Sequence, residues 1–468
     1  MTPIDETYED LEAKGPALKF GLNKAYLRYR LNQLIFLLLI GSCALIFLLM
    51  MKLQLFRYWG EFLGSSPFLK FMSWPMLVSL VGIVLGLSLQ TILWFRYRQE
   101  SVSGEGPDFP WPAVSVIVAA LNEEASVDGA LDSIFEGAYP KDRLEVICVN
   151  DGSTDGTEER LRRAREKWGG RLRVVNFKKN QGKRKALYVG YKLAKGGIIA
   201  TVDADSKVGK NAVRNLVLPL IRDERCGAVG GRIAVLNEKA NFLTRMLAVR
   251  YSISFDFGRA YQSVFGTVVS CSGALMAVRR TVFGSVMKDF LGQTFRGVPV
   301  KHGEDRALTT LVLRAGYEVK YQSNAVVYTA APTNWRQMNR MYMRWTRSYV
   351  RETVFLARFI FSRKRQARHR ILPLIDFVFL NFLPPFHLLA IGIILYAFAV
   401  DPSSLVRHLV FIILLAFIMS LYYLRTNRSW AFLYGIPYAL IAAFLQWWIV
   451  PVSVLTMRNQ SWETRKAG

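Results

Sequence analysis

The amino-acid sequence predicts an α/β domain, built on a mostly parallel sheet, that is inserted between α-helical transmembrane segments. Two observations lead to this prediction. Strand-like and helix-like segments alternate from residue 113 to residue 300, as in sheets with helices on both faces. Uncharged apolar runs flank this region, and most reach the roughly 20 residues that a helix needs to cross a bilayer. The length of 468 residues allows two or three domains.

The apolar runs come first in the chain and return at its end. They cover residues 31–51, 71–95, 377–400, 409–424 and 429–457. The first starts too far from the N-terminus, and is too long, to be a cleaved signal peptide. We expect a basic N-terminal arm at 1–30, two transmembrane helices within 31–98, and a transmembrane or re-entrant region at 371–457.

The chain is strongly basic, with a formal net charge of +26. Much of this charge borders the apolar runs, for example at Arg96, Arg98 and the segment SRKRQARHR at 362–370. Positive loops mark the cytoplasmic side of a membrane. We therefore expect a multi-pass protein of the plasma membrane, here a bacterial inner membrane, with the domain at 99–330 in the cytosol. Membrane lipid is an expected partner; nucleic acid is not, because no nucleic-acid-binding motif accompanies the charge.

Acidic side chains follow two of the expected strands. The strand at 143–151 ends at Asp151, and the strand at 197–203 ends at Asp203, with Asp205 two residues further on. Ligands of parallel sheets lie at the carboxyl ends of the strands. Oxygen ligands favour Mg²⁺ or Mn²⁺, which complete their shell with phosphate oxygens. A solvated turn is the alternative explanation for the Asp203–Asp205 pair taken alone.

A basic segment supplies the candidates for holding a phosphate. NQGKRKAL, at 180–187, is expected to be a loop in which Gly182 precedes Lys183, Arg184 and Lys185. Ammonium and guanidinium groups suit a diphosphate, although a basic surface turn explains the segment equally well. The segment lacks the Walker pattern, so ATP hydrolysis has no support.

Two helix-like segments follow. Glu304 and Asp305 stand at an expected helix start, where an acid is favoured by the helix dipole alone. Asp305 is also a candidate general base. Aromatic, methionine and arginine side chains then alternate over 333–361, within a segment 331–370 that we assign to amphipathic helices at the membrane interface. Arg344 and Trp345 are its candidate functional residues, with simple membrane anchoring as the alternative.

Six segments appear in the order ALNEE, VNDGSTDGT, DAD, CSGAL, GEDRALT and MRWTRSYVRE. This set resembles the processive family 2 glycosyltransferases, and within them the hyaluronan synthase and nodulation chitin-oligosaccharide synthase branch. The resemblance implies a GT-A type domain with a mixed, mostly parallel sheet at 99–330. It also implies a hexosyltransferase that adds sugars from UDP-sugar donors (UDP-GlcNAc, with or without UDP-GlcA) to a growing β-linked polysaccharide and secretes it. Alternatives are a synthase of chitin oligosaccharide or another exopolysaccharide, and non-processive transfer to a lipid phosphate.

The resemblance further implies roles for individual residues. Asp305 would be the catalytic base, and Asp205 would lie nearest a Mg²⁺ or Mn²⁺ ion. Donor-side contacts would come from Glu123, Asp151, Lys183, Asp203 and Arg344, and Glu304 would be a further substrate-binding residue. The acceptor would be bordered by Cys271, Ser272, Gly273 and Trp345. Trp462 and Arg465 would close over the nucleotide, because WETR in the tail at 458–468 is similar to the Trp-Gly-Thr-Arg motif that ends hyaluronan synthases.

Two residues depart from the family pattern. Met341 stands where the family has Gln, and Glu463 stands where the terminal motif has Gly. The tail must be cytosolic to meet a nucleotide, so the number of crossings should be even. One of the three C-terminal runs is therefore expected to re-enter, to lie at the interface or to cross twice. Pro384, Pro385 and Pro437 mark places where a helix could break.

Overall fold

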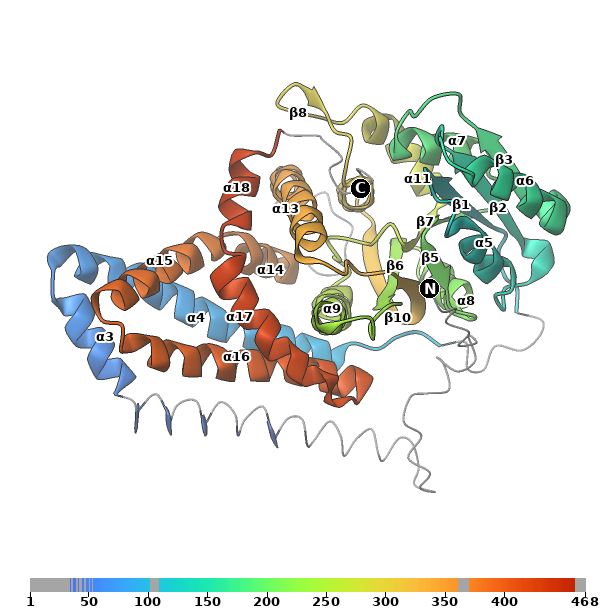
Figure 1. Cartoon of the computed structure of the whole chain (residues 1–468). Coiled ribbons are helices and arrows are strands. Elements are labelled where there is room, and N and C mark those ends of the chain that lie inside the picture. Colours follow the sequence, from blue (N-terminus) through green and yellow to red (C-terminus); the bar gives the residue numbers. More distant parts are fainter. Residues whose placement is uncertain are drawn as a thin grey trace, which may run out of the picture. The chain divides into compact units, whose positions relative to one another are not determined.

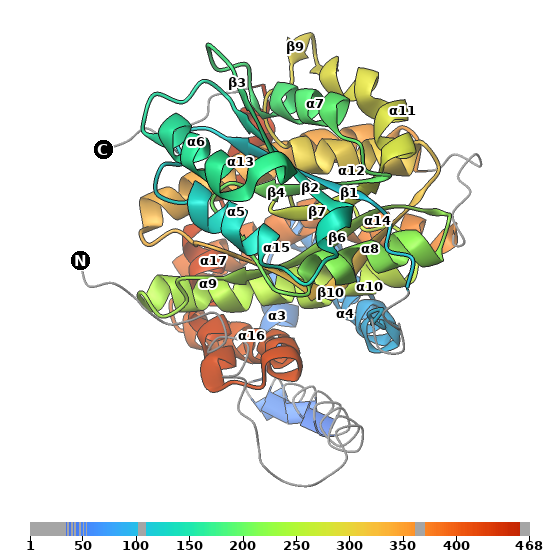
Figure 2. The same cartoon turned by 90° about the vertical axis from the view of Figure 1, so that its right-hand side faces the viewer.

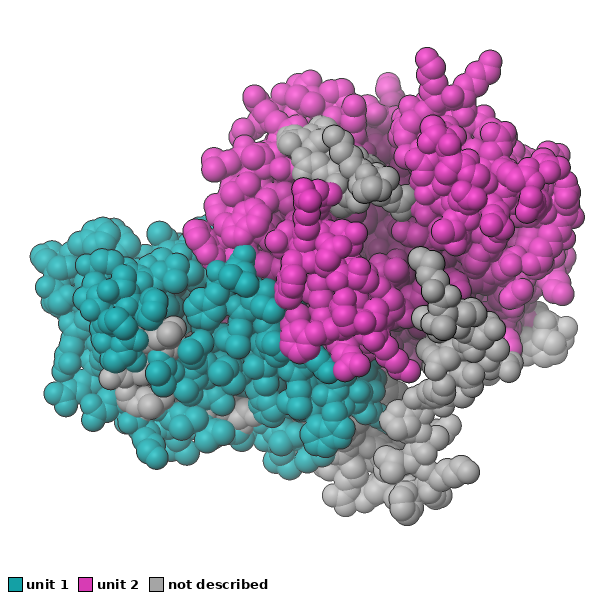
Figure 3. All heavy atoms as spheres, in the orientation of Figure 1, with its two compact units in different colours: residues 1–81, 384–445 teal, residues 82–383, 446–468 magenta. Residues whose placement is uncertain are grey.

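The computed structural model of the chain describes residues 54–101, 109–360 and 370–458, together with scattered positions between 34 and 52. These residues form two compact units, shown in separate colours in Figure 3. Unit 1 comprises residues 1–81 and 384–445, and unit 2 comprises residues 82–383 and 446–468. The α/β domain belongs to unit 2.

The centre of unit 2 is an eight-stranded sheet in the order β3-β2-β1-β4-β7-β6-β10-β5 (Figure 1). β1 pairs in parallel with β2 and β4, β2 with β3, and β6 with β10, whereas β7 is antiparallel to both its neighbours and β5 is antiparallel to β10. The sheet is thus mixed and mostly parallel, as predicted. The strands are β1 (Val114–Ala120), β2 (Leu144–Asn150), β3 (Leu172–Asn176), β4 (Ile198–Asp203), β5 (Ser206–Val208), β6 (Cys226–Val235), β7 (Leu275–Arg279) and β10 (Glu318–Thr329).

Helices cover both faces of this sheet. Figure 2 shows α7 and α11 on one side of the strands, and α5 and α8 on the other. Side chains such as Ile117 and Ile147 on the strands, and Leu131 and Ile134 on α5, are completely buried between these layers. The helices of the domain are α5 (Val127–Phe135), α6 (Thr157–Trp168), α7 (Lys183–Leu193), α8 (Ala212–Arg222), α9 (Phe242–Ser252), α10 (Ala260–Val264), α11 (Arg280–Leu291) and α12 (Glu304–Arg314).

Four short elements complete the domain. A π-helix, Ile253–Arg259, joins α9 to α10. A two-stranded hairpin, β8 (Thr294–Phe295) with β9 (Val298–Pro299), lies between α11 and α12. Single 3-10 turns at Lys141–Arg143 and Gly169–Arg171 lead into β2 and β3. Among the longer elements, β4 matches the strand predicted at 197–203, and α12 begins at Glu304, where the sequence predicts a helix start.

The segment 180–187 differs from its prediction as a loop. Helix α7 begins at Lys183, directly after Gly182, whose φ of 90° lies in a region that a side chain disfavours. Lys, Arg, Ala and Leu are all strong helix formers. Ala186 and Leu187 are buried in the core, which fixes the helix against the sheet.

Helix α13 (Trp335–Ala357) corresponds to the amphipathic segment predicted at 333–361. Helix α18 (Ile449–Leu455) packs along it: Ser453 Oγ lies 3.0 Å from the sulfur of Met343, and Arg347 Nε donates to Thr456 Oγ1 at 3.1 Å. Unit 2 also contains α14 (Ile371–Asn381).

The apolar runs form helices of different lengths. Among the described residues, α4 (Pro67–Arg96) is the one single helix long and apolar enough to span a bilayer, with a mean hydropathy of 2.2. Trp430–Leu445 and Ile449–Leu455 meet the same criterion only if taken together as a bent pair. The run at 31–51 lies largely outside the described residues. The other helices are α3 (Leu55–Gly64), α15 (Pro384–Val400), α16 (Ser404–Asn427) and α17 (Gly435–Leu445), with a 3-10 segment at Trp430–Tyr434.

Pro384 and Pro437 have different effects on the helices that contain them. The run 377–400 is interrupted between α14 and α15, where Pro384 starts a new helix, because a proline ring cannot accommodate the preceding helical turn. Pro437 lies instead in the first turn of α17, where proline is tolerated. The last run breaks at residues 446–448, after α17.

Candidate active site

Lys183 joins two carboxylates from distant parts of the chain. Its Nζ lies 2.5 Å from Asp203 Oδ1, at the end of β4, and 3.0 Å from Glu304 Oε1, at the start of α12. Between 11% and 31% of each of these three side chains is exposed. The first residues of α7 and α12 and the last residue of β4 therefore meet at one point.

This arrangement keeps Lys183 and Glu304 charged. Burial disfavours the ammonium, but the carboxylates of Asp203 and Glu304 outweigh it and raise the pKa of Lys183. Burial likewise favours a neutral Glu304, yet the Lys183 ammonium brings the pKa of Glu304 down to about 2. The cation that the Asp203 carboxylate holds in the described structure is thus a lysine side chain.

Asp305 lies beside this cluster, in the first turn of α12. Its Oδ2 accepts a hydrogen bond from the backbone N–H of Gly273 at 3.2 Å, and its Oδ1 accepts one from the N–H of Arg306 at 2.7 Å. Burial, and then the neighbouring Glu304 carboxylate, raise the pKa of Asp305. A half-buried carboxylate with a raised pKa is a better proton acceptor than an ordinary aspartate.

The segment Cys271–Gly273 closes the site from the side of β7. A Cβ at Gly273 would lie 3.3 Å from Lys183 Nζ and 3.6 Å from both Asp203 Oδ1 and the Asp305 Cβ. The Cys271 N–H donates to Thr309 Oγ1 at 3.1 Å, and that hydroxyl donates to the Asp305 carbonyl at 2.8 Å. Burial raises the pKa of the Cys271 thiol to about 12, so the thiol stays protonated. Ser272 lies between these two residues and is half-buried.

Asp151 and Glu123 extend the site along the same sheet edge. Asp151 follows β2, is 3% exposed, and accepts from the N–H groups of Gln181 and Gly182 at 2.7 and 2.9 Å. Burial raises the pKa of Asp151, and these two donors oppose the rise. Glu123 follows β1; its N–H donates to Thr157 Oγ1 at 2.8 Å, and its Oε2 accepts from Ser126 Oγ at 2.7 Å. The contacts to Gln181 and Gly182 place Asp151 next to the start of α7.

Asp205 is the candidate ligand for a divalent metal ion. Its side chain is exposed in the turn after β4, with Ser206 Oγ donating to its Oδ1 at 3.3 Å. Among the described residues no three His, Cys, Asp or Glu side chains form a metal cluster. Mg²⁺ commonly uses one or two carboxylates and takes its other ligands from phosphates and water. One exposed carboxylate fits such an ion only when a diphosphate completes the shell.

Helix α13 carries Arg344 and Trp345 and packs on the start of α12. A Cβ at Gly303 would lie 1.8 Å from Ser348 Oγ, one turn after Arg344. Trp345 is 43% exposed, and its ring centroid lies 5.9 Å from that of Tyr251. Met341, in the position of the family's Gln, is buried with its sulfur 3.6 Å from the Tyr251 hydroxyl. Trp462 and Arg465 lie outside the described residues.

Arg184 differs from its predicted role as a phosphate ligand. It is 7% exposed, and it donates to the Phe290 carbonyl at 2.6 Å and to Gln293 Oε1 at 2.8 Å. Because α7 begins at Lys183, successive side chains point in directions about 100° apart. Lys183 therefore faces the acids while Arg184 turns into the protein.

Sequence reasoning also missed buried polar residues on α13. Arg351 is 2% exposed and Glu352 is completely buried. Residues 344, 348 and 351 recur at helical spacing, so their common face could have been found once Arg344 was singled out. The sequence pattern does not indicate that this face is buried, because a face with two arginines is usually exposed to solvent.

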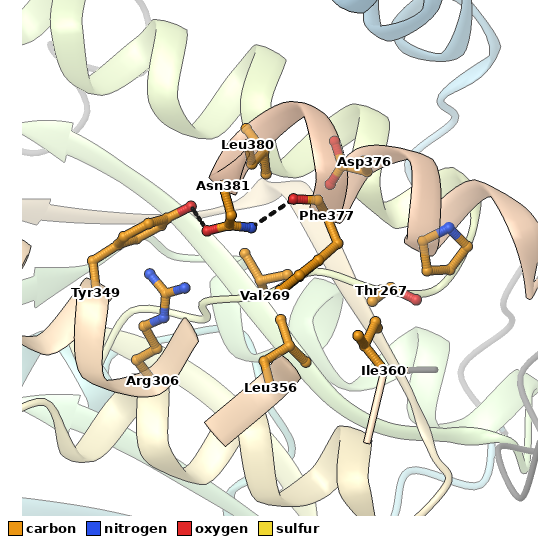
Figure 4. Close-up of a pocket in the computed structure, with 11 residues that line it drawn as sticks. Thr267, Val269, Arg306, Tyr349, Leu356, Ile360, Asp376, Phe377, Leu380 and Asn381 are labelled. Atoms are coloured by element: carbon orange, nitrogen blue, oxygen red, sulfur yellow. Dashed lines mark hydrogen bonds between the residues drawn. The ribbon is translucent and has the colours of Figure 1, made fainter. Parts of the chain in front are cut away.

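A small hollow beside Arg306 is lined by residues of α12, α13 and α14 (Figure 4). The Arg306 guanidinium stacks on the Tyr349 ring at 3.8 Å, and the Tyr349 hydroxyl donates to Asn381 Oδ1 at 3.2 Å. The hollow has a volume of about 10 Å³, which is close to that of one water molecule. A larger cavity, of about 240 Å³, lies at the end of α4 beside Tyr97 and Lys320 and contains none of the candidate site residues.

Known proteins resemble this chain in sequence and in fold. The model of the family described as "Glycosyl transferase family 2" matches residues 115–286. An N-acetylglucosaminyltransferase of Rhizobium meliloti is 36% identical over 251 residues, and one of Mesorhizobium japonicum is 34% identical over 256 residues. These alignments cover 53% and 54% of this chain, and the chain spans only 58% and 59% of the length of those two relatives.

Two further similarities extend over more of the chain. A hyaluronan synthase of Streptococcus pyogenes is 30% identical over 395 residues, which are 83% of this chain and 91% of the relative. In three dimensions, a mannosyltransferase of Pyrobaculum calidifontis, solved in complex with GDP-Man and Mn²⁺, matches with a TM-score of 0.50 at 20% identity. That match covers 80% of this chain and 99% of the mannosyltransferase, and it supports the GT-A-like fold of the mixed sheet.

Proposed function

The chain belongs to glycosyl transferase family 2, and we propose that it is a membrane-embedded, processive, inverting hexosyltransferase. It polymerises sugars from UDP-sugar donors into a β-linked polysaccharide and secretes the product. The alignment with a hyaluronan synthase supports this proposal, because it runs over 83% of the chain and so includes most of the helices outside the α/β domain.

The observation that carries the proposal is the meeting of separate segments at one sheet edge. Asp203 ends a strand, Lys183 and Glu304 start two different helices, and the Gly273 backbone donates to Asp305. A fold held together by an apolar core has no need of such a half-buried charge cluster. Carboxylates with shifted pKa values, here Glu304 and Asp305, are typical of catalytic sites, and ligands of parallel sheets lie at the strand ends, where Asp203 stands.

The donor lies along this edge in the proposal. Asp151 and Glu123 contact the uridine, and Lys183 leaves its carboxylate partners to contact the diphosphate, with Arg344 steadying it. Asp205 holds a Mg²⁺ or Mn²⁺ ion, which neutralises charge on the leaving diphosphate when bound. The Mn²⁺ in the mannosyltransferase complex is consistent with such an ion in this fold.

The transfer is a single displacement. Asp305 accepts the proton of the acceptor hydroxyl while that oxygen forms its bond to the anomeric carbon of the donor sugar. The bond from this carbon to the UDP oxygen breaks, and UDP leaves with the electron pair. The configuration changes from α to β, and no covalent enzyme intermediate is needed. Cys271, Ser272 and Gly273 line the acceptor pocket, and Trp345 borders the acceptor sugar.

The membrane arrangement follows from the same proposal. The protein is a multi-pass protein of the bacterial inner membrane whose domain at 99–330 faces the cytosol, where UDP-sugars are made. The proposed parts are an arm at 1–30, transmembrane helices at 31–98, interfacial helices at 331–370, a transmembrane or re-entrant region at 371–457 and the tail at 458–468. Trp462 and Arg465 of the tail close over the nucleotide.

The product distinguishes two candidate functions. A hyaluronan-type product requires UDP-GlcNAc and UDP-GlcA, and the long alignment with a hyaluronan synthase favours it. A chitin-oligosaccharide product requires UDP-GlcNAc alone, and the higher identity to the N-acetylglucosaminyltransferases favours that alternative. Non-processive transfer to a lipid phosphate is the remaining alternative; it has no need of α13 and the terminal motif.

One experiment tests the proposal. The purified protein is incubated with labelled UDP-GlcNAc, with and without UDP-GlcA, and the product is digested with hyaluronidase and with chitinase. A long product sensitive to one of these enzymes is expected. Labelled lipid with a single added sugar, or no transfer from either donor in the presence of Mg²⁺ or Mn²⁺, contradicts the proposal.

A further inference from the structure

We infer that Arg351 and Glu352, near the end of α13, are positioning residues for Asp305: they fix the turn His302–Gly303 from which α12 and its carboxylate start. This inference rests on the proposed function, in which Asp305 is the base. Neither residue touches the reacting atoms in the proposal. They act through the backbone that carries Asp305.

The first contact is made directly on the turn. Arg351 Nη2 donates to the His302 carbonyl oxygen at 2.5 Å. Gly303, the next residue, has a φ of 78° and lies so close to α13 that a Cβ there would be 1.8 Å from Ser348 Oγ and 3.3 Å from Arg351 Nη2. The backbone two residues before Asp305 is therefore clamped against one turn of α13.

The second contact leads back to the other side of the site. Glu352 Oε1 accepts from Gln293 Nε2 at 2.9 Å, and Gln293 Oε1 accepts from Arg184 Nη2 at 2.8 Å. Arg184 is the neighbour of Lys183, whose ammonium lies 3.0 Å from Glu304. The contacts thus form a closed chain that runs through the start of α7, residue 293, α13 and the start of α12.

The buried charges are costly, which argues that they do more than stabilise the fold. Arg351 and Glu352 are 2% and 0% exposed, and their closest charged atoms, Arg351 Nε and Glu352 Oε1, are 3.8 Å apart. Among the residues the structure describes, Glu352 Oε2 and Arg351 Nε have no hydrogen-bond partner. Replacing such a pair by apolar side chains of similar volume is often neutral or stabilising. What an apolar pair could not supply is the directed bond to the His302 carbonyl.

A displaced turn would act on the chemistry rather than on donor binding. Two donor-side residues, Asp151 directly after β2 and Lys183 at the start of α7, make their described side-chain contacts with residues outside α13. A catalytic group misplaced by about 1 Å can lower a rate by about 100-fold. Loosening would also admit water to Asp305. The titratable and charged groups around Asp305 are Glu304 and Arg306 on its own helix, Lys183 and Arg184 on α7, and the Cys271 thiol before β7.

The test compares full-length variants purified in detergent. Arg351→Met removes the bond to the His302 carbonyl, Arg351→Lys keeps the charge, and Glu352→Gln keeps the bond to Gln293. Arg358→Met is the matched control, because Arg358 is exposed at the end of the same helix. For each variant, kcat with UDP-GlcNAc is measured from pH 4 to pH 9, together with the Kd for UDP and the thermal midpoint.

We expect Arg351→Met to lower kcat by about 100-fold, with the Kd for UDP changed less than about threefold. The acid limb of its rate profile should move to lower pH, because a more solvated Asp305 has a lower pKa. Arg351→Lys should recover at least about a tenth of the wild-type rate, and Arg358→Met should match the wild type. If Arg351→Met does not fold, Glu352→Leu, which removes the bond to Gln293, replaces it, with the same shift of the acid limb expected; Glu352→Gln, which keeps that bond, should leave the limb unmoved.

Two results would overturn the inference while leaving the proposed function intact. One is a kcat within about threefold of the wild type in a folded Arg351→Met protein. The other is a loss of rate that only follows the folded fraction, with the acid limb unmoved. A folded wild-type protein that binds UDP but transfers no sugar would overturn the proposed function itself, and with it this inference.

Discussion

Replacing Lys183 by Met tests the charge cluster that links the fold to its proposed chemistry. The variant leaves Glu304, only 11% exposed, facing a neutral side chain where it had an ammonium at 3.0 Å. Asp203 loses its partner as well, but with 31% of its side chain exposed it is better screened by water. The main cost should therefore fall on Glu304.

The size of this cost follows from the pKa of Glu304. The cluster lowers that pKa from 4.5 to about 2, and each pKa unit corresponds to about 1.4 kcal/mol. The lost stabilisation is therefore roughly 3 kcal/mol as an upper value. We expect the thermal midpoint to fall by about 5–10 °C and the affinity for UDP to fall by about 100-fold, since a charge-assisted contact to phosphate is lost.

The assay includes a double variant and a surface control. In Lys183→Met/Glu304→Gln the buried charge is removed with its partner, so most of the stability should return while activity stays lost. Lys192→Met, on the exposed face of α7, should have no effect. A double variant that is less stable than Lys183→Met, or a Lys183→Met protein that binds UDP as the wild type does, would refute the reasoning.

Three further predictions concern the same site. Gly303→Ala should lower the unfolding free energy by about 2–4 kcal/mol, because its Cβ meets Ser348 and its φ is positive, whereas Gly170→Ala, with open space around it, should be neutral in the same thermal melts. Transfer should be lost as the pH falls through the raised pKa of Asp305, since only the ionised base accepts a proton, and Glu304→Gln should move this limb of the rate profile to lower pH. EDTA should abolish transfer, Mg²⁺ or Mn²⁺ should restore it, and Asp205→Asn should raise the metal concentration for half-maximal rate at least about tenfold. A Gly303→Ala protein as stable as the wild type would contradict the first prediction, an unmoved limb the second, and transfer unaffected by EDTA the third.

The sheet edge could be predicted from sequence because topology alone defines it. An apolar strand that ends in Asp151 and another that ends in Asp203 must present their acids at the same edge if the strands are parallel. The sheet has this parallel arrangement through β2, β1 and β4. The alternation of segments was therefore sufficient to bring these two residues together.

The contacts across the site could not be predicted in this way. Lys183 and Glu304 are far apart in sequence, and their meeting depends on how α7 and α12 pack on one face of the sheet. The start of α7 was missed because Gly182 reads equally well as part of a loop, which also left the inward turn of Arg184 unseen. The burial of Arg351 was not predicted either, since a periodic pattern does not report which basic side chains are buried.

The most direct test of the account is Asp305→Asn, measured for both sugar transfer and UDP binding. The amide keeps the shape of the side chain but cannot accept the acceptor's proton. We predict that polymer formation falls by at least about 100-fold while the Kd for UDP stays within about threefold of the wild type. Normal polymer formation, or a loss of UDP binding equal to the loss of transfer, would contradict the role of Asp305 as the base.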